Sequence, residues 1–97
     1  MPTFIVLMNY TDQGIKGIKE APGRIAEWGK AIAAGGGKKI GSYTVMGQYD
    51  RVLIVEAPSD EVIMSALLQL GRAGNVRTTT LKAFTDEQFA EMVKKLP

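Results

Sequence analysis

The chain has 97 residues, of which 45% are hydrophobic and 23% are charged, so its composition is that of a folded globular protein rather than a disordered one. Twelve basic and ten acidic side chains give a net charge of +2 and are scattered along the chain, which argues against a nucleic-acid-binding surface. The absence of cysteine and histidine excludes disulfides, thiolate or imidazole metal sites and catalysis by a serine or cysteine paired with histidine.

The length predicts one domain, residues 1–97, with a core thin enough that association with another copy would help it. The apolar run near the start, residues 4–8, is too short for a signal-peptide core or a membrane span. We therefore expect a cytoplasmic protein that uses no membrane, nucleic acid, metal or cofactor.

Residues 3–10, "TFIVLMNY", are β-branched and aromatic and predict the first strand. Neighbouring side chains of a strand point to opposite faces, and both alternating sets here are apolar. One set is Phe4, Val6 and Met8, and the other is Ile5 and Leu7. Both faces of this strand therefore need to be buried.

A helix should follow, with Thr11 as its cap and one apolar stripe along it. The stripe is Ile15, Ile18, Pro22, Ile25, Trp28 and Ile32. Pro22 lacks the amide that a helix interior needs, so we expect a short helix, a break and a restart with Pro22 in its first turn. The helix should end at "GGG", residues 35–37, and Trp28 is expected to pack in the core or an interface.

A polar second strand is predicted at about 39–46, and "RVLIVEA" at 51–57 predicts a third strand that is apolar on both faces. Ser59 should start a second helix that buries Ile63, Ala66, Leu67 and Leu70 and stops at Gly71 or Gly74. A fourth strand follows at 76–84. "TDEQ" at 85–88 then forms a capping box, with Phe84 and Phe89 placed for a hydrophobic staple. The last helix is expected to pack through Phe89, Met92, Val93 and Leu96.

This order predicts an α+β, ferredoxin-like βαββαβ fold with an extra C-terminal helix and a four-stranded antiparallel sheet. The first and third strands should lie in its centre, because they are the two that are apolar throughout. Two helices cover only one face of such a sheet. We therefore expect a homodimer or a larger ring to cover the other face.

Two loops are candidate sites. "AGGGKKIGS", residues 34–42, resembles a phosphate-binding loop in composition only, since its glycine spacing is wrong and it leads from a helix into a strand. "GQYD", residues 47–50, is the stronger candidate. Gly47 and Asp50 suit a turn, but a turn does not explain Tyr49, whose phenol beside a carboxylate could orient a small polar ligand or join two protomers.

Five segments together resemble the GYD domain family, small bacterial and archaeal proteins named for the Gly-x-Tyr-Asp turn. They are "YT..G" (Tyr10, Thr11, Gly14), "APGR" (21–24), "GGG", "SYTVMGQYD" and "GNVRTTTLKAF". The resemblance spans nearly the whole chain and implies the dimeric α/β barrel type of fold, but no specific function. The second half is also similar to the effector-binding domain of the Lrp/AsnC regulators, which implies oligomers and amino-acid binding near the hairpin. Their DNA-binding helix-turn-helix is missing here.

We expect the protein to bind a small polar metabolite at the hairpin, through Gly47, Tyr49, Asp50, Arg51 and Arg24. The alternatives are a cofactor-independent enzyme of the dimeric α/β barrel type, using Tyr10, Tyr43, Tyr49 or Asp50, and a purely structural subunit. The lack of histidine makes the enzyme the less favoured alternative.

Overall fold

The computed structural model describes residues 1–97 and has one four-stranded antiparallel sheet. Its strands are β1 (Thr3–Tyr10), β2 (Lys38–Thr44), β3 (Arg51–Glu56) and β4 (Val76–Ala83), in the spatial order β2-β3-β1-β4. The prediction that the first and third strands are central is confirmed. The two strands with apolar side chains on both faces take the positions where both faces can be covered.

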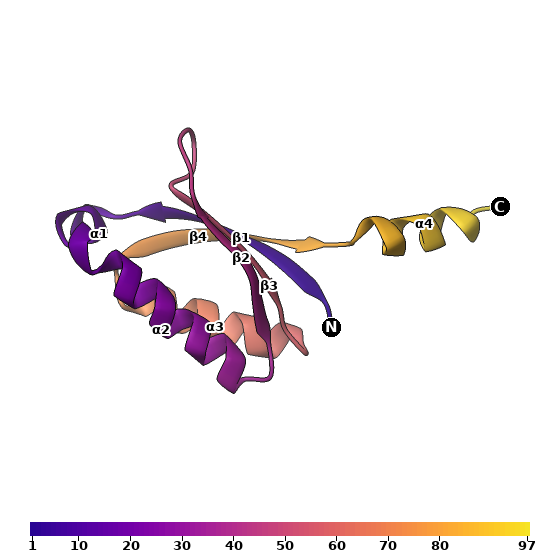
Figure 1. Ribbon diagram of the computed structural model, residues 1–97, viewed down its shortest axis with the longest axis horizontal. Helices are drawn as coiled ribbons and strands as arrows, with labels where there is room; N and C mark the ends of the chain where they lie inside the picture. The colour runs from indigo at the N-terminus through magenta and orange to yellow at the C-terminus, as the bar shows by residue number, and fades with distance from the viewer.

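The helices are α1 (Asp12–Lys16), α2 (Ala21–Ala34), α3 (Asp60–Arg72) and α4 (Asp86–Lys94), with a 3₁₀ turn, η1 (Ile18–Glu20), between α1 and α2. Helices α2 and α3 lie side by side on one face of the sheet, and α4 extends the chain beyond the sheet (Figure 1). The fold is therefore the predicted α+β, ferredoxin-like arrangement with an additional C-terminal helix.

The broken first helix is also confirmed. Thr11 caps α1, because its side chain accepts a hydrogen bond from the amide of Gly14. The helix restarts at Ala21 with Pro22 in the first turn, where the missing proline amide has no helical partner to lose. This restart sets the direction in which the side chains of α2 leave the helix.

The core lies between the sheet and α2 and α3. Its sheet side is Phe4, Val6, Met8, Leu53 and Val55, and its helix side includes Trp28, Ile32, Ile63 and Ala66. The indole N–H of Trp28 donates to the carbonyl of Ala66 over 2.9 Å, which joins α2 to α3. The core role expected for Trp28 is confirmed.

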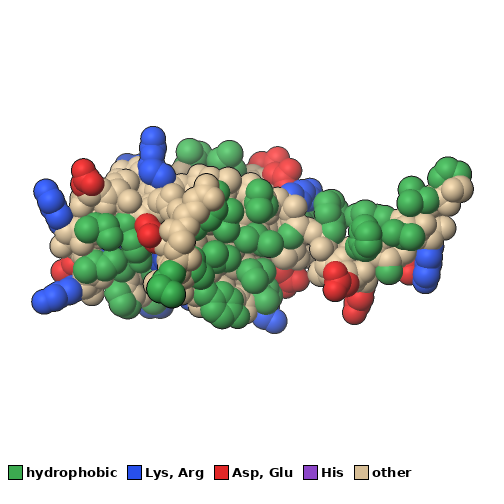
Figure 2. All heavy atoms as spheres, turned by 90° about the horizontal axis from the view of Figure 1, so that it is seen from above, with side chains coloured by type: hydrophobic (Ala, Val, Ile, Leu, Met, Phe, Trp, Pro, Cys, Tyr) green, Lys and Arg blue, Asp and Glu red, His purple; other side chains and the backbone are tan.

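The other face of the sheet carries Ile5, Leu7, Val52, Ile54 and Leu81. Ile5 pairs with Ile54 on one side and with Leu81 on the other, so the apolar side chains form a row across three strands. Figure 2 looks onto this face and shows hydrophobic side chains along it. We call it the open face, because no helix of the chain covers it. The expected dimer stays a prediction.

The last helix forms where the sequence predicts it, with both hydrogen bonds of the Thr85 and Gln88 capping box present. Its predicted packing is wrong. The side chains of Phe89, Met92, Val93 and Leu96 are 43–68% exposed, because α4 continues away from the body of the chain and nothing in the same chain lies against it (Figure 1). None of the helices has the length and apolar character needed to cross a bilayer.

Candidate functional site

Three loops that are far apart in the sequence meet at the end of the sheet where β1 ends and β4 begins. The amide of Thr11 donates to the carbonyl of Asn75 over 3.0 Å, and the Thr11 hydroxyl donates to the carbonyl of Gly74 over 2.6 Å. A Cβ at Gly14 would overlap the Asn75 carbonyl oxygen, so only glycine allows this close approach. The "YT..G" segment is thereby fixed to the start of β4.

The Gly47–Asp50 hairpin joins the same end of the sheet through Asp50. The Asp50 carboxylate accepts a hydrogen bond from the amide of Tyr10 over 2.9 Å, and the Asp50 amide donates to the carbonyl of Met8, also over 2.9 Å. The amide of Val45 donates to the Asp50 carbonyl and closes the hairpin. Asp50 therefore connects the hairpin to the end of β1.

Gly47 and Tyr49 of the hairpin have different surroundings. Gly47 has a φ of +118°, as its predicted turn role requires, and a Cβ there would meet nothing. Tyr49 is half-buried, and its phenolic hydroxyl makes no hydrogen bond within the chain. A free hydroxyl is open to an external partner, so Tyr49 keeps a binding role as a prediction.

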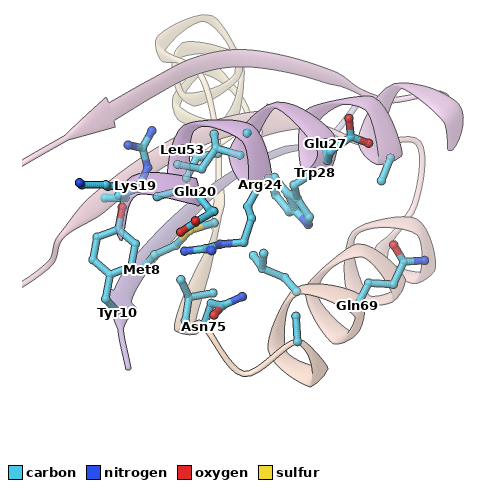
Figure 3. A pocket seen from close by; sticks show the side chains of 18 residues that line it. Met8, Tyr10, Lys19, Glu20, Arg24, Glu27, Trp28, Leu53, Gln69 and Asn75 are labelled. Atoms are coloured by element: carbon cyan, nitrogen blue, oxygen red, sulfur yellow. The ribbon is translucent and has the colours of Figure 1, made fainter. Parts of the chain in front are cut away.

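A cavity of about 680 Å³ opens beside this junction, between the sheet, α2 and α3. Its apolar wall includes Met8, Leu53, Trp28, Ile25, Leu70 and Val76. Its polar groups include Tyr10, Lys19, Glu20, Arg24, Arg51 and Asn75. Figure 3 shows Arg24 reaching from α2 toward Met8 and Asn75, with Tyr10 at one side. The cavity therefore combines an apolar wall with a few charged groups.

Arg51 is held at the cavity by neutral partners. It stands at the start of β3, and its guanidinium donates to the hydroxyls of Thr44 over 2.6 Å and Ser42 over 2.7 Å. Both hydroxyls come from β2, which pairs with β3 at this point. The Arg51 Nε is buried and has no hydrogen-bond partner. The side chain is thus fixed in direction and still has a free donor.

Arg24 reaches the cavity from the first turns of α2. Its guanidinium donates to the carbonyl of Gly17 over 3.1 Å, which ties α2 back to the break that precedes it. Glu20 lies on the same wall, but the structure has three ion pairs and neither arginine belongs to any of them. Two guanidinium groups without a carboxylate partner therefore line one cavity.

The predicted site residues fall into two groups. Arg24 and Arg51 line the cavity, whereas Gly47, Tyr49 and Asp50 do not and belong to the hairpin next to it. The sequence interpretation missed Asn75 and did not connect Tyr10 with the arginines. The signal for both was present, since "YT..G" and "GNV" were among the segments that carried the family resemblance.

The cavity can bind an anion, since a guanidinium presents a planar set of donors that matches a carboxylate. The Asp50 carboxylate, which was the predicted acid or base, is already bonded to backbone and does not line the cavity, so it is not placed for acid and base catalysis there.

These features define a class: a ferredoxin-like α+β domain with a largely apolar cavity between its sheet and its helices, into which a few charged groups reach. Within that class, the chain belongs to the GYD domain family, whose model matches residues 4–93. The expectation from the sequence segments is confirmed.

One curated relative is 39% identical to this chain over 97 residues, and the alignment covers 99% of this chain and 99% of the relative. It is the glutamine synthetase and cystathionine beta-lyase binding protein of Thermus thermophilus. Among solved structures, TTHA0845 from Thermus thermophilus is 30% identical, with a TM-score of 0.54 over 88% of this chain and 95% of that one.

A feast or famine regulatory protein from M. tuberculosis, complexed with L-methionine, has a TM-score of 0.65 to this structure. The match covers 91% of this chain and 56% of the regulator, at 21% identity. This likeness shows the ferredoxin-like fold, and this chain spans about half of the regulator's length.

Proposed function

We propose that this protein binds a small metabolite bearing a carboxylate in the cavity between the sheet, α2 and α3. Arg51 and Arg24 are the residues that hold the carboxylate in this proposal. The supporting observation is that both guanidinium groups line the cavity without an acidic partner. The Gly47–Asp50 hairpin then has a supporting role, because Asp50 holds the adjoining end of β1.

Electrostatics favours an anion here. A partly buried cation loses hydration and is stabilised by a counter-charge, which Ser42 and Thr44 do not supply. A carboxylate bound beside the guanidinium groups of Arg51 and Arg24 would supply that counter-charge. Hydrogen bonds between ionised groups are roughly twice as strong as neutral ones.

The size and lining of the cavity favour a small ligand with an apolar part. About 680 Å³ lies within the range of roughly 300–1,000 Å³ that is usual for small-molecule sites. Trp28, Leu53 and Leu70 offer an apolar lining in the same cavity as the arginines. Amino acids and other carboxylic acids of modest size combine the two properties.

A thermal-shift screen of amino and carboxylic acids tests this function. A ligand at about 100 times its dissociation constant stabilises the folded state by about 2.7 kcal/mol. In a chain of this size that is roughly ten degrees or more in melting temperature. Arg51→Gln and Arg24→Gln should each weaken binding at least tenfold, which reduces the stabilisation at the same ligand concentration to about 1.4 kcal/mol or less.

Arg77→Gln is the matched control. This substitution also replaces an arginine by glutamine, but on β4, where Arg77 lies opposite Asn9 of β1 and does not line the cavity. It should keep the full shift. The proposal fails if no acid shifts the parent protein, or if all three variants respond as the parent does.

A second candidate function is the binding of a metabolic enzyme. The observation that favours it is the relative at 39% identity, which is named for binding glutamine synthetase and cystathionine beta-lyase. Size-exclusion chromatography of this protein mixed with each of these two enzymes from its own source tests it. Co-elution with either one supports the function, and separate elution of both contradicts it.

A further inference from the structure

Strand β4 is an edge strand whose outer side has no partner in the chain. It pairs with β1 alone, through eight consecutive residue pairs from Val76 to Ala83. None of the backbone hydrogen bonds outside the helices and the sheet involves a residue of β4. Only alternate residues of an antiparallel strand bond to one neighbour, so about half of the backbone groups of β4 point outward. Such an edge is a template for a further strand.

The opposite edge of the sheet, β2, is a poorer template. Its pairing with β3 is interrupted by a register shift between Lys39 and Gly41. An irregularity of this kind bends a strand and breaks its row of outward groups. The pairing of β4 has no such shift. A straight strand therefore fits better along β4 than along β2.

An apolar groove of about 670 Å³ lies beside this edge, between β4 and α3. We call it the β4 groove. Its lining includes the buried side chains of Phe4 and Ile63, and also Met64 and Leu68 of α3, which are 55% and 65% exposed. Thr80 lines it from β4. Because side chains of a strand alternate between the two faces of a sheet, every second side chain of a strand added to β4 would point to the side of the sheet that carries the groove.

The two ends of the β4 groove differ in charge. Asp60 and Glu61 begin α3, and only Asp60 has an ion-pair partner, Lys82 of β4 at 3.8 Å. At the other end, Arg72 ends α3 and Arg77 is the second residue of β4, and neither of them forms an ion pair. An extended segment with a basic residue beside Glu61 and an acidic residue beside the two arginines would complement both ends.

A second copy of β4 does not have this charge pattern. Strand β4, "VRTTTLKA", contains two basic residues and no acidic one. Pairing of β4 with itself would therefore bring two basic strands together and supply no acidic residue from the added strand. Like charges on neighbouring strands are destabilising. The charges favour a segment of a different protein.

We propose that the edge of β4 and the β4 groove bind an extended segment of a partner protein, which adds a strand antiparallel to β4. Main-chain hydrogen bonds to the outward groups of β4 supply affinity, and apolar side chains at alternate positions fill the groove. In this direction the basic residue of the segment is near its N-terminal end, beside Glu61. The proposal goes beyond the ligand cavity, since the groove and the cavity share no lining residue, and it does not require the partner to be an enzyme.

NMR spectroscopy of the isotopically labelled protein with a synthetic peptide tests the proposal. The probe is an eight-residue peptide with capped ends, lysine first, aspartate last, and valine and threonine alternating between them. We expect chemical-shift changes in β4 and α3, and slower hydrogen exchange at alternate amides of β4. No binding at millimolar peptide, shifts without protection of β4 amides, or protection of β2 amides instead overturns the proposal. Outward amides of β4 that are already protected without peptide would show a second copy at this edge and also overturn it.

Modified peptides test the strand pairing without changing the protein. Methylation of the backbone nitrogens of one alternate set of peptide residues should abolish binding, because those amides face β4, and methylation of the other set should leave it intact. The charge-reversed peptide, with aspartate first and lysine last, should bind about threefold more weakly or worse. Equal binding of the two methylated peptides, or of the two charge patterns, contradicts the proposal.

A variant of the groove gives the matching result from the side of the protein. Leu68→Asp changes an exposed position, and it should weaken peptide binding about tenfold, because it removes apolar surface that the peptide buries. Ile40→Asp is the control, because Ile40 is 50% exposed on β2 at the other edge of the sheet. It should bind the peptide as the parent does. Equal affinity of the two variants for the peptide overturns the assignment of the groove.

Discussion

Asp50→Ala is expected to destabilise the fold, because the Asp50 carboxylate accepts the amide of Tyr10 across 40 residues of sequence. Loss of the acceptor leaves a partly buried backbone N–H without its partner. Such a loss costs about 1–3 kcal/mol, and the lower part of that range applies here since water can partly replace the carboxylate. In a domain of this size about 1–2 kcal/mol corresponds to a drop in melting temperature of roughly 4–16 °C.

The measurement is the free energy of unfolding from urea titration, with melting temperature as a second reading and no ligand present. Asp50→Asn keeps an oxygen acceptor but loses the charge, so it should lie between the parent and Asp50→Ala. Tyr49→Phe is the control at the neighbouring position. Its hydroxyl has no partner in the chain, so its free energy of unfolding should stay within about 0.5 kcal/mol of the parent. If Asp50→Ala is as stable as Tyr49→Phe, the structural role assigned to Asp50 is wrong.

Two further substitutions test the packing that forms the cavity. Gly14→Ala places a methyl group against the Asn75 carbonyl, so it should lower the free energy of unfolding by about 1–3 kcal/mol. Gly23→Ala is the control, because a Cβ at Gly23 meets nothing, and it should not lower the free energy of unfolding by a comparable amount. Trp28→Phe removes the donor to the buried Ala66 carbonyl and should cost about 1–3 kcal/mol by urea titration, and an unchanged midpoint would contradict the proposed link between α2 and α3.

Local features were predictable from the sequence because their partners are only a few residues away. Thr11, Ser59 and Thr85 cap their helices through amides three residues on, and all three caps are present. The strand order was also predictable, since an apolar pattern on both faces of a strand requires a central position.

The site was only partly predictable, because its geometry depends on contacts across the whole chain. Arg24 and Arg51 were both named from the sequence, but their shared cavity depends on how α2 lies over β3. Asp50 was interpreted as a possible ligand contact, and its bond to the Tyr10 amide depends on tertiary structure. For α4 the pattern identified the apolar face correctly, but a pattern of this kind carries no information on what covers that face.

The most direct test of the proposed function is a crystal structure of the protein with the acid that gives the largest thermal shift. The account predicts the ligand inside the cavity, with carboxylate oxygens about 2.7–2.9 Å from guanidinium nitrogens of Arg51 or Arg24. Its apolar part should lie against Trp28 and Leu70. A ligand bound on the open face or outside the hairpin at Tyr49, with both arginines in their present positions and the cavity empty, would contradict it.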